Sequence, residues 1–245
     1  MNWTMPPCHP TTDTGEFFPG EILPREISLI VFDWDGTLMD SEAQIVSCLR
    51  AAVSDLSLEP MDDERLRNVI GLGLREAIDT LIPGRDEVFY QAFIANYRRH
   101  WFNSGGSSLF AGVRDMLDIF RRQHFLLGVA TGKARRGLDR VLGETGLERC
   151  FHATRCADEA PSKPHPQMLI DLMNELDAPP EQTLMVGDTE YDMEMATNAG
   201  AAKIAVATGV HSAERLNRHA PLVCLRRISD MPAWMSNAGI VAVNK

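Results

Sequence analysis

The stretch that decides the fold is Ile27-Ser28-Leu29-Ile30-Val31-Phe32, followed at once by Asp33-Trp34-Asp35-Gly36-Thr37-Leu38. A short apolar run rich in β-branched residues is typical of a strand that is buried on both faces, as in a parallel sheet. Asp35, Gly36 and Thr37 favour a turn, so the strand ends at Asp33 and continues into a loop. The sequence therefore predicts a central parallel strand that carries two aspartates at its carboxyl end.

Apolar runs of the same kind recur along the chain. They predict strands over 125–130, 183–187 and 202–206, with weaker candidates near 150–153 and 222–225, and they are separated by helical stretches over 113–123, 135–142, 166–176 and 191–198. Because strands and helices alternate, we expect an α/β fold, a doubly wound parallel sheet with helices on both faces. Ligands of such sheets bind at the carboxyl ends of the strands.

The stretch 42–108 interrupts this alternation. Val46, Leu49, Val53 and Leu56 recur at helical spacing, and more helical pieces are predicted over 63–70, 74–81 and 86–101. Gly105-Gly106-Ser107-Ser108 provides a flexible exit from the stretch. The predicted organisation is a loosely ordered N-terminal tail at 1–24, an α/β core at 25–41 and 109–233, an inserted all-helical cap domain at 42–108, and a C-terminal tail at 234–245.

The composition is that of an ordinary globular protein, with 44% hydrophobic and 24% charged residues. Lys and Arg together number 24 against 34 Asp and Glu, and the net charge of −10 argues against a nucleic-acid partner or an anionic membrane surface. A membrane-spanning helix needs about 20 apolar residues, and no such run occurs. The five cysteines are scattered and odd in number, which predicts a reducing, cytoplasmic location.

Residues 98–101, Arg-Arg-His-Trp, form a basic and aromatic cluster within the predicted cap. Such a cluster is one feature of nucleic-acid binding proteins. Given the negative charge of the whole chain, we expect it instead to lie on the cap surface or to contact the core.

Chemically reactive side chains fall where the predicted strands end. They are Asp33 and Asp35 after the first strand, Thr131 after 125–130, Lys163 in the loop Ser162-Lys163-Pro164, and Asp188 with Asp192 after 183–187. The carboxyl ends of parallel strands meet at one edge of a sheet, so these groups are expected to converge. The spacing of four between Asp188 and Asp192 predicts that both face the same way on one helical turn.

The charges of this cluster predict a metal ion. Four carboxylates and a phosphate dianion total roughly −6, which Lys163 alone does not balance. Oxygen ligands and a phosphate favour Mg²⁺ over zinc. An aspartate pair at a strand end can bind such a cation and leave one carboxylate oxygen free to attack phosphorus.

Phosphoryl transfer depends mainly on in-line positioning and on positive charge around the phosphoryl oxygens. Lys163 and the metal would supply the charge. Thr131 and the backbone amides of Gly132 and Lys133, at a strand-to-helix junction, would donate hydrogen bonds to the phosphate. Asp35 would protonate the leaving alkoxide and later deprotonate the hydrolytic water.

Four segments resemble, in order, the four motifs of the haloacid dehalogenase superfamily: Asp33-Trp34-Asp35-Gly36-Thr37-Leu38, Thr131-Gly132, Lys163-Pro164-His165-Pro166 and Gly187-Asp188-Thr189-Glu190-Tyr191-Asp192. The chain is most similar to the phosphoglycolate phosphatase branch, which has a helical cap after the first motif. That branch usually has Asn at the position of Gly132.

The resemblance implies a role for each motif. Asp33 would be the nucleophile that forms an aspartyl-phosphate, and Asp35 the general acid and base. Thr131 and Lys163 would bind phosphoryl oxygens. Mg²⁺ would be held by Asp33, the carbonyl of Asp35 and Asp188, while Asp192 would orient a metal-bound water or Lys163.

The expected function is hydrolysis of a small phosphate monoester by a monomer or homodimer, with phosphoglycolate as the leading substrate. Arg75, which follows Gly71-Leu72-Gly73-Leu74 in the cap, would bind the substrate carboxylate or would simply be a solvated arginine at a helix start. A sugar-phosphate mutase of the same superfamily is one alternative. A phospho-accepting signalling module of the receiver type is another, although it lacks both a cap and an Asp33-x-Asp35 pair on one strand.

Overall fold

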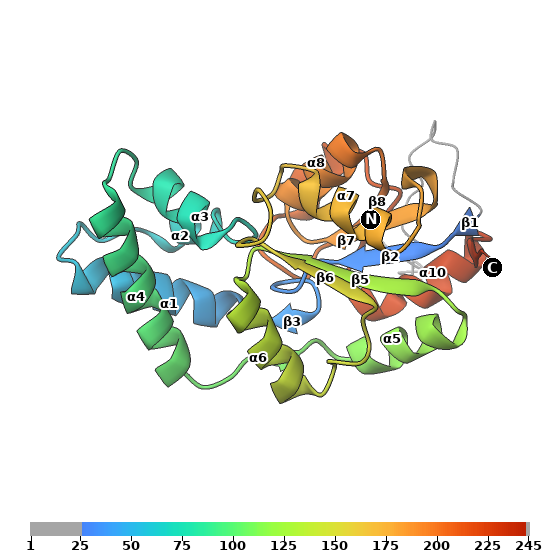
Figure 1. Cartoon of the computed structure of the whole chain (residues 1–245), viewed down its shortest axis with the longest axis horizontal. Helices are drawn as coiled ribbons and strands as arrows, with labels where there is room; N and C mark the ends of the chain where they lie inside the picture. Colours follow the sequence, from blue (N-terminus) through green and yellow to red (C-terminus); the bar gives the residue numbers. More distant parts are fainter. Residues whose placement is uncertain (1–25, 244–245) are drawn as a thin grey trace, which may run out of the picture.

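The computed structural model describes residues 26–243, so the tail predicted at 1–24 lies outside the described residues. The core is built on a six-stranded parallel sheet (Figure 1). Its strands, in spatial order, are β6 (Ala153–Cys156), β5 (Leu126–Thr131), β2 (Leu29–Phe32), β7 (Thr183–Gly187), β8 (Ala202–Val206) and β9 (Cys224–Leu225). The first long strand, β2, therefore lies in the middle, and the chain winds outward from it in both directions.

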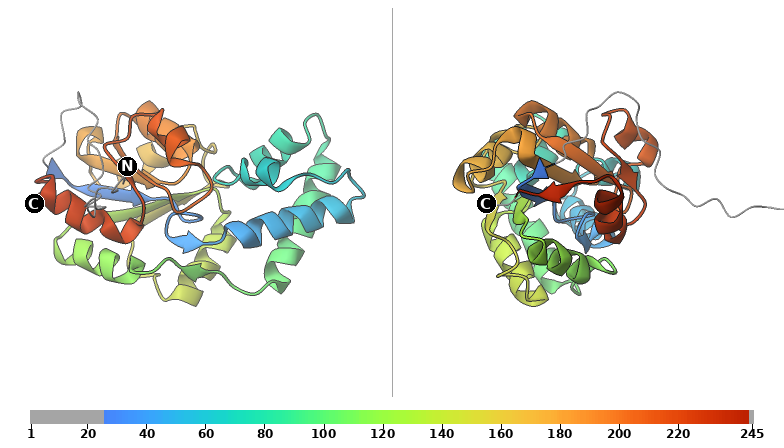
Figure 2. Two further views of the ribbon diagram at one scale, coloured as in Figure 1. Left: turned by 180° about the vertical axis from the view of Figure 1, so that it is seen from behind. Right: turned by 90° about the vertical axis from the view of Figure 1, so that its right-hand side faces the viewer.

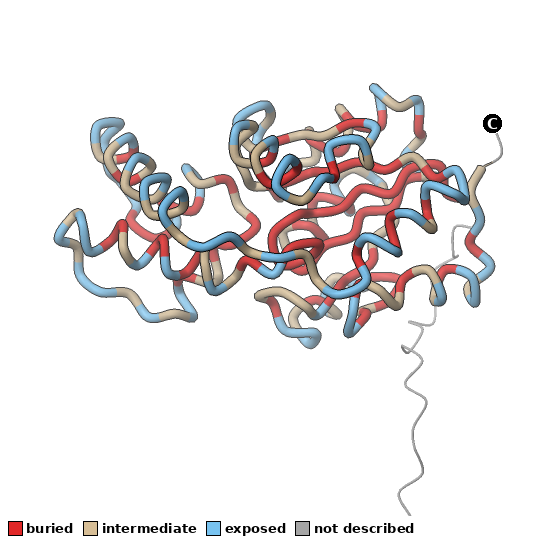
Figure 3. The backbone as a smooth tube through the Cα atoms, turned by 90° about the horizontal axis from the view of Figure 1, so that it is seen from below, coloured by how far each residue is buried: buried red, intermediate tan, exposed pale blue. Residues whose placement is uncertain are grey.

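Helices cover both faces of the sheet because successive strand side chains point to opposite sides. Ile30 and Phe32 pack in the cluster that includes α5 (Val113–Arg122), α6 (Arg135–Thr145) and α10 (Met231–Asn237). Leu29 and Val31 pack in the cluster that includes α7 (Gln167–Glu175) and α8 (Glu190–Ala199). Figure 3 shows the strands side by side as a continuous buried layer, surrounded by partly exposed helices. The prediction of a doubly wound α/β fold is confirmed.

The inserted segment forms a second lobe of four helices, on the left of Figure 1. They are α1 (Glu42–Asp55), α2 (Asp63–Arg67), α3 (Leu74–Leu81) and α4 (Glu87–Asn103). Leu49, Ile78 and Phe93, among others, give this lobe a hydrophobic core of its own. We call it the cap.

The chain enters and leaves the cap through two short strands that lie side by side. Strand β3 (Met39–Asp40) pairs antiparallel with β4 (Ser108–Leu109), so the two crossings form one ribbon. This ribbon joins the cap to the core near the carboxyl end of β2.

The cap also touches the core through side chains and backbone. The carbonyl of Asn68, just after α2, accepts a hydrogen bond from the Tyr191 hydroxyl (2.7 Å), and its side-chain oxygen accepts one from Arg215 (2.6 Å). The N–H of Gly73 donates to the Ser162 hydroxyl (2.7 Å). These contacts hold the loop between α2 and α3 against the core.

The described part of the predicted C-terminal tail, 234–243, belongs to the core, and the prediction of a tail there is wrong. Met235 and Ile240 are buried in the cluster beneath the sheet. Strand β10 (Val241–Ala242) pairs in parallel with β1 (Glu26–Ile27), and Figure 2 shows the two strands side by side. The apolar residues of this segment are interrupted by Ser236, Asn237 and Gly239, and Met235 and Ile240 pack against a sheet face formed elsewhere in the chain.

Most element bounds differ from the predicted ones by one to three residues. The apolar run 27–32 is divided between β1 and β2, because Ile27 pairs with β10 while Leu29 begins the pairing with β5 and β7. The strand predicted near 150–153 starts only at Ala153, where pairing with Gly128 begins. The remaining short elements are α9 (Ala213–Asn217) and the 3₁₀ turns at Pro180–Gln182 and Ile228–Asp230.

The C-terminal segment supplies a direct test of this packing. Ile240 is 5% exposed and the adjacent Val241 is 56% exposed. Ile240→Ala is expected to lower the free energy of unfolding by about 2 to 5 kcal/mol, because it leaves a cavity beneath the sheet. Val241→Ala, the matched control, is expected to change it by no more than about 0.5 kcal/mol. Urea denaturation of both variants measures the difference, and equal small effects would show that this segment does not stabilise the core.

Candidate active site

The reactive residues predicted from the sequence meet at the carboxyl end of the sheet. Asp33 directly follows β2, Asp188 directly follows β7, and Thr131 is the last residue of β5. These three strands are neighbours, with β2 in the middle, so the sheet order itself brings the three side chains to one place.

A buried lysine connects two of the aspartates. The Lys163 side chain is fully buried, and its Nζ lies 2.7 Å from Asp33 Oδ1 and 2.7 Å from Asp192 Oδ1. Lys163 lies in the loop between β6 and α7, and the carbonyl of the next residue, Pro164, accepts a hydrogen bond from Asn198 of α8 (3.0 Å). The ammonium therefore links β2 to the first turn of α8.

Both oxygens of Asp192 are engaged. While Oδ1 contacts Lys163, Oδ2 accepts hydrogen bonds from the N–H (3.1 Å) and the hydroxyl (2.7 Å) of Thr189. The Asp192 N–H donates in turn to the Thr189 hydroxyl oxygen (3.4 Å), which completes the capping box of α8. Asp188 precedes this helix rather than lying on it, so helical spacing is not what brings Asp188 and Asp192 together. Of the two roles expected for Asp192, its contacts favour the orientation of Lys163.

Asp188 is held from two sides. Its Oδ1 accepts a hydrogen bond from the Thr37 hydroxyl (2.8 Å), and its Oδ2 accepts one from the N–H of Val210 (3.1 Å). A β-carbon at Gly36 or Gly209 would overlap this carboxylate, and Gly36 also has a positive φ of +80°. The turn after Asp35 therefore needs glycine in order to close around Asp188.

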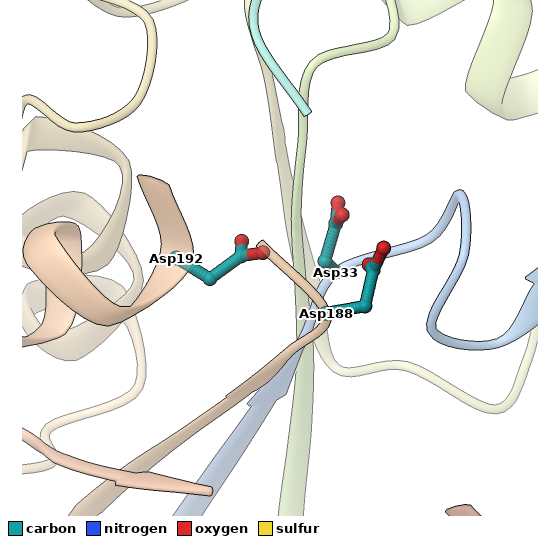
Figure 4. A group of neighbouring side chains, drawn as sticks. All are labelled: Asp33, Asp188 and Asp192. Atoms are coloured by element: carbon teal, nitrogen blue, oxygen red, sulfur yellow. The ribbon is translucent and has the colours of Figure 1, made fainter. Parts of the chain in front are cut away.

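The three aspartates form a group whose geometry suits a metal ion. One carboxylate oxygen from each of Asp33, Asp188 and Asp192 lies within 4.8 Å of the others. Figure 4 shows the Asp33 and Asp188 side chains extending side by side beyond the strands, with Asp192 directed toward them from α8. Among residues 26–243, Asp33 Oδ2 is buried without any hydrogen-bond partner. A hard cation with oxygen ligands fits this group of buried carboxylates.

Electrostatics supports the same interpretation. Burial, together with the charge of Asp192, raises the pKa of Asp33 to about 7 although Lys163 opposes the rise. Burial and the charges of Asp33 and Asp192 raise the pKa of Asp188 well above its ordinary value. Burial alone would lower the pKa of Lys163, but the fields of Asp192 and Asp33 raise it above its ordinary value. One ammonium does not compensate three buried carboxylates, and a divalent cation would.

Asp35 is placed by two groups that the sequence did not connect to it. The Ser41 hydroxyl donates to Asp35 Oδ1 (2.6 Å), and Lys133 Nζ lies 3.0 Å from the same oxygen. Lys133 Nζ also lies 4.2 Å from the centre of the Trp101 ring of the cap. Within the basic and aromatic cluster 98–101, Trp101 thus contacts the core, whereas Arg99 and His100 pair with Asp55 of α1 in the cap.

Thr131 and Gly132 stand where the core meets the loop between α2 and α3. Thr131 is completely buried, and its hydroxyl oxygen accepts a hydrogen bond from the N–H of Lys133 (3.2 Å), which leaves the hydroxyl proton free to be donated. A β-carbon at Gly132 would overlap the carbonyl oxygen of Leu72. The absence of a side chain at Gly132 therefore allows the cap loop to approach the site this closely.

Comparisons with known proteins agree with this geometry. The family model described as haloacid dehalogenase-like hydrolase matches residues 30–206. The chain belongs to this family. A protein of Dickeya dadantii (strain 3937) named "Probable phosphatase IndB" is 36% identical over 210 residues, covering 83% of this chain and 91% of that protein. A phosphoglycolate phosphatase of Chromobacterium violaceum is 28% identical over 217 residues, covering 84% and 97%.

A solved structure shows the same fold. The haloacid dehalogenase-like hydrolase of Streptococcus pneumoniae superposes with a TM-score of 0.74 at 22% identity, covering 85% of this chain and 98% of that chain. The predicted family, its phosphoglycolate phosphatase-like branch and the enzyme class, a phosphatase, are confirmed. No helix within residues 26–243 is long and apolar enough to cross a membrane.

Arg75 is engaged within the cap. Its guanidinium donates to Glu87 Oε2 (2.7 Å) and lies 4.4 Å from the centre of the Tyr90 ring. The side chain is half exposed at the edge of the space between cap and core. These contacts favour the alternative of a solvated arginine near a helix start, and binding of a substrate carboxylate by Arg75 stays a prediction.

The side chain of Lys133 is the functional candidate that sequence reasoning missed. Only its backbone amide was expected to act, because Lys133 follows Thr131 at a strand-to-helix junction. Its position directly after the second motif is the only signal in the sequence, and that signal does not indicate that the ammonium turns back toward Asp35.

The pKa values predict how magnesium affects stability. Because the pKa of Asp33 is raised from 3.8 to about 7, the metal-free folded protein binds more protons than the unfolded chain between these values. Protonation of Asp33 therefore stabilises the metal-free folded state. This contribution to the free energy of unfolding is fully present below about pH 4 and is lost as the pH rises through about 7. Mg²⁺ binds deprotonated carboxylates, so it should raise the melting temperature more at about pH 8 than at about pH 5.

Thermal unfolding with and without Mg²⁺ at the two pH values measures this effect. In Asp188→Asn the rise in melting temperature caused by Mg²⁺ at about pH 8 should shrink markedly. Asp115 is an exposed acid at the start of α5, and Asp115→Asn should keep the full rise. A Mg²⁺-induced rise in melting temperature that is the same at both pH values, or that survives in Asp188→Asn, would contradict the metal site.

Gly132→Ala tests the contact of the cap loop. The added β-carbon should displace the carbonyl of Leu72 and with it the loop 71–73, so we expect kcat/KM for phosphate monoesters to fall about tenfold or more while the core stays folded. Gly143→Ala in α6, where the nearest atom to a β-carbon lies at 3.6 Å, is the control and should leave kcat/KM unchanged. Equal kinetics for the two variants would mean that the loop does not position groups of the site.

Proposed function

We propose that this protein is a magnesium-dependent phosphatase that hydrolyses a phosphate monoester through an aspartyl-phosphate on Asp33. The observation that carries the proposal is the buried, unpartnered Oδ2 of Asp33, whose other oxygen is held by Lys163. A carboxylate with one oxygen fixed and the other free is oriented for attack on phosphorus.

In the first step, an oxygen of Asp33 attacks the phosphorus of the ester while the bond from phosphorus to the leaving oxygen breaks. Asp35 gives its proton to that oxygen, so the product leaves as a neutral alcohol. In the second step, water attacks the phosphorus of the aspartyl-phosphate, and Asp35 takes up a proton from the water. Inorganic phosphate leaves and Asp33 is restored.

Lys163 and Thr131 would hold phosphoryl oxygens, together with the backbone amides of Gly132 and Lys133. Mg²⁺, held by Asp33, Asp188 and the carbonyl of Asp35, would neutralise the negative charge that the phosphoryl group and the carboxylates bring together. Asp192 would keep Lys163 directed at Asp33, which its 2.7 Å contact with the ammonium supports.

Ser41 and Lys133 would position Asp35 for proton transfer. Both contact Oδ1, which makes Oδ2 the oxygen for exchange of a proton with the leaving group and with water.

Asp33→Asn should abolish steady-state phosphate release, with a loss on the order of 1,000-fold or more, because the amide is a poor nucleophile for phosphorus. Asp40→Asn, an exposed acid on β3, is the control and should keep full activity. Circular dichroism of both variants would establish that the fold is intact. Substantial turnover by folded Asp33→Asn would refute the nucleophile assignment.

The same assay separates the alternative functions. A phosphatase releases phosphate over many turnovers, whereas a mutase returns the phosphoryl group to a second hydroxyl of its substrate and a receiver-type module retains it. The acidic pair that follows a single strand, and the helical cap beside it, support the phosphatase over the receiver-type module.

A further inference from the structure

A cavity of about 360 Å³ lies between the cap and the proposed nucleophile. Asp33, Asp35 and Lys133 line it on the core side, and most of the remaining wall belongs to the cap. The cavity offers far more space than a phosphoryl group with a two-carbon alcohol fills.

The cap side of the cavity is mainly apolar and aromatic. Its wall includes Leu49, Ile70, Leu72, Ile94, Tyr97 and Trp101. Tyr97 and Trp101 occupy successive turns of α4, with ring centres 6.2 Å apart and planes inclined by 19°. Ligand sites lined in this way favour apolar and aromatic groups.

The aromatic wall begins beside the group that would protonate the leaving oxygen. Trp101 covers Lys133, and Lys133 contacts Asp35 at 3.0 Å. With phosphorus at Asp33 and the leaving oxygen at Asp35, the carbon skeleton of the alcohol extends toward Trp101 and Tyr97.

The cations that line the cavity are poorly placed for a small carboxylate. Arg75 is paired with Glu87, and Lys133 is paired with Asp35. Arg98 and Arg136 are exposed, where water screens their charge, and the Arg136 guanidinium lies 5.4 Å from the centre of the Phe102 ring. A carboxylate placed against Leu49 and Ile94 would lose its hydration without a compensating partner.

We propose that the substrate is a phosphate monoester whose alcohol carries an uncharged, flat ring, rather than a short carboxylated ester such as phosphoglycolate. The proposal rests on the proposed function and deepens it. The ring would fill the apolar part of the cavity along Tyr97 and Trp101 while the phosphoryl group binds at Asp33.

The test compares esters that differ only beyond the reacting bond. In 2-phenylethyl phosphate and propyl phosphate the leaving group is a primary alkyl alcohol of similar acidity, so the chemistry at phosphorus is matched. Burial of the ring should raise kcat/KM for the phenylethyl ester about 10- to 100-fold above that for the propyl ester. Phosphoglycolate should be no better than the propyl ester, and 2-cyclohexylethyl phosphate, with a thicker ring, should be poorer than the phenylethyl ester.

Two variants of α4 link this preference to the cavity. Tyr97→Leu removes a ring from the wall, and the ratio of kcat/KM for the phenylethyl ester to that for the propyl ester should fall about fivefold or more. Phe93→Leu, which alters a buried ring of the cap core outside the cavity wall, should keep the ratio. Because each ratio is measured on one preparation, partial unfolding of a variant cancels.

The outcomes separate the inference from the proposed function. Phosphate release that is fastest with phosphoglycolate, and selectively lost in Arg75→Ala, would overturn the inference and leave the phosphatase intact. Equal kcat/KM values for the phenylethyl and propyl esters would overturn the inference that the alcohol carries a ring. Equal values for the phenylethyl and cyclohexylethyl esters would overturn the inference that the ring is flat. Absence of phosphate release from every ester in the presence of Mg²⁺ would refute the proposed function itself.

Discussion

The buried ammonium of Lys163 between Asp33 and Asp192 is the interaction on which the site depends. Removing charged groups from water costs several kcal/mol for each ion, so neither the lysine nor the acids are tolerated there alone. The contact joins three separate pieces of chain: the end of β2, the loop after β6 and the first turn of α8. Since Asp192 also belongs to the capping box of α8, the start of that helix and the position of the ammonium are coupled.

A second coupling crosses from core to cap. Trp101 lies over Lys133, Lys133 contacts Asp35, and the carbonyl of Leu72 lies against Gly132. The surroundings of the proposed acid and base are therefore incomplete without the cap. A site assembled from both lobes would tie the choice of leaving group to the cap residues that lie over Lys133 and line the cavity beside Asp35.

Sequence patterns located the buried elements better than the partly exposed ones. Strands β7 and β8 have the predicted bounds, because strands covered on both faces consist of nearly continuous apolar residues. The segment containing Met235 and Ile240 was predicted to be a tail, although both residues are buried in the core. Their burial depends on the face of a sheet that is formed by distant parts of the chain.

The sequence by itself determined the α/β fold, the helical insertion, and the positions of Asp33, Thr131 and Asp188 at one sheet edge. These follow from local patterns, because parallel strands all present their carboxyl ends on the same side. Only the tertiary structure decided which oxygen of Asp33 stays unpartnered, that Lys133 turns toward Asp35, and that Arg75 pairs with Glu87. Such details depend on the way in which long side chains pack against segments that are remote in sequence, and no local sequence pattern predicts that packing.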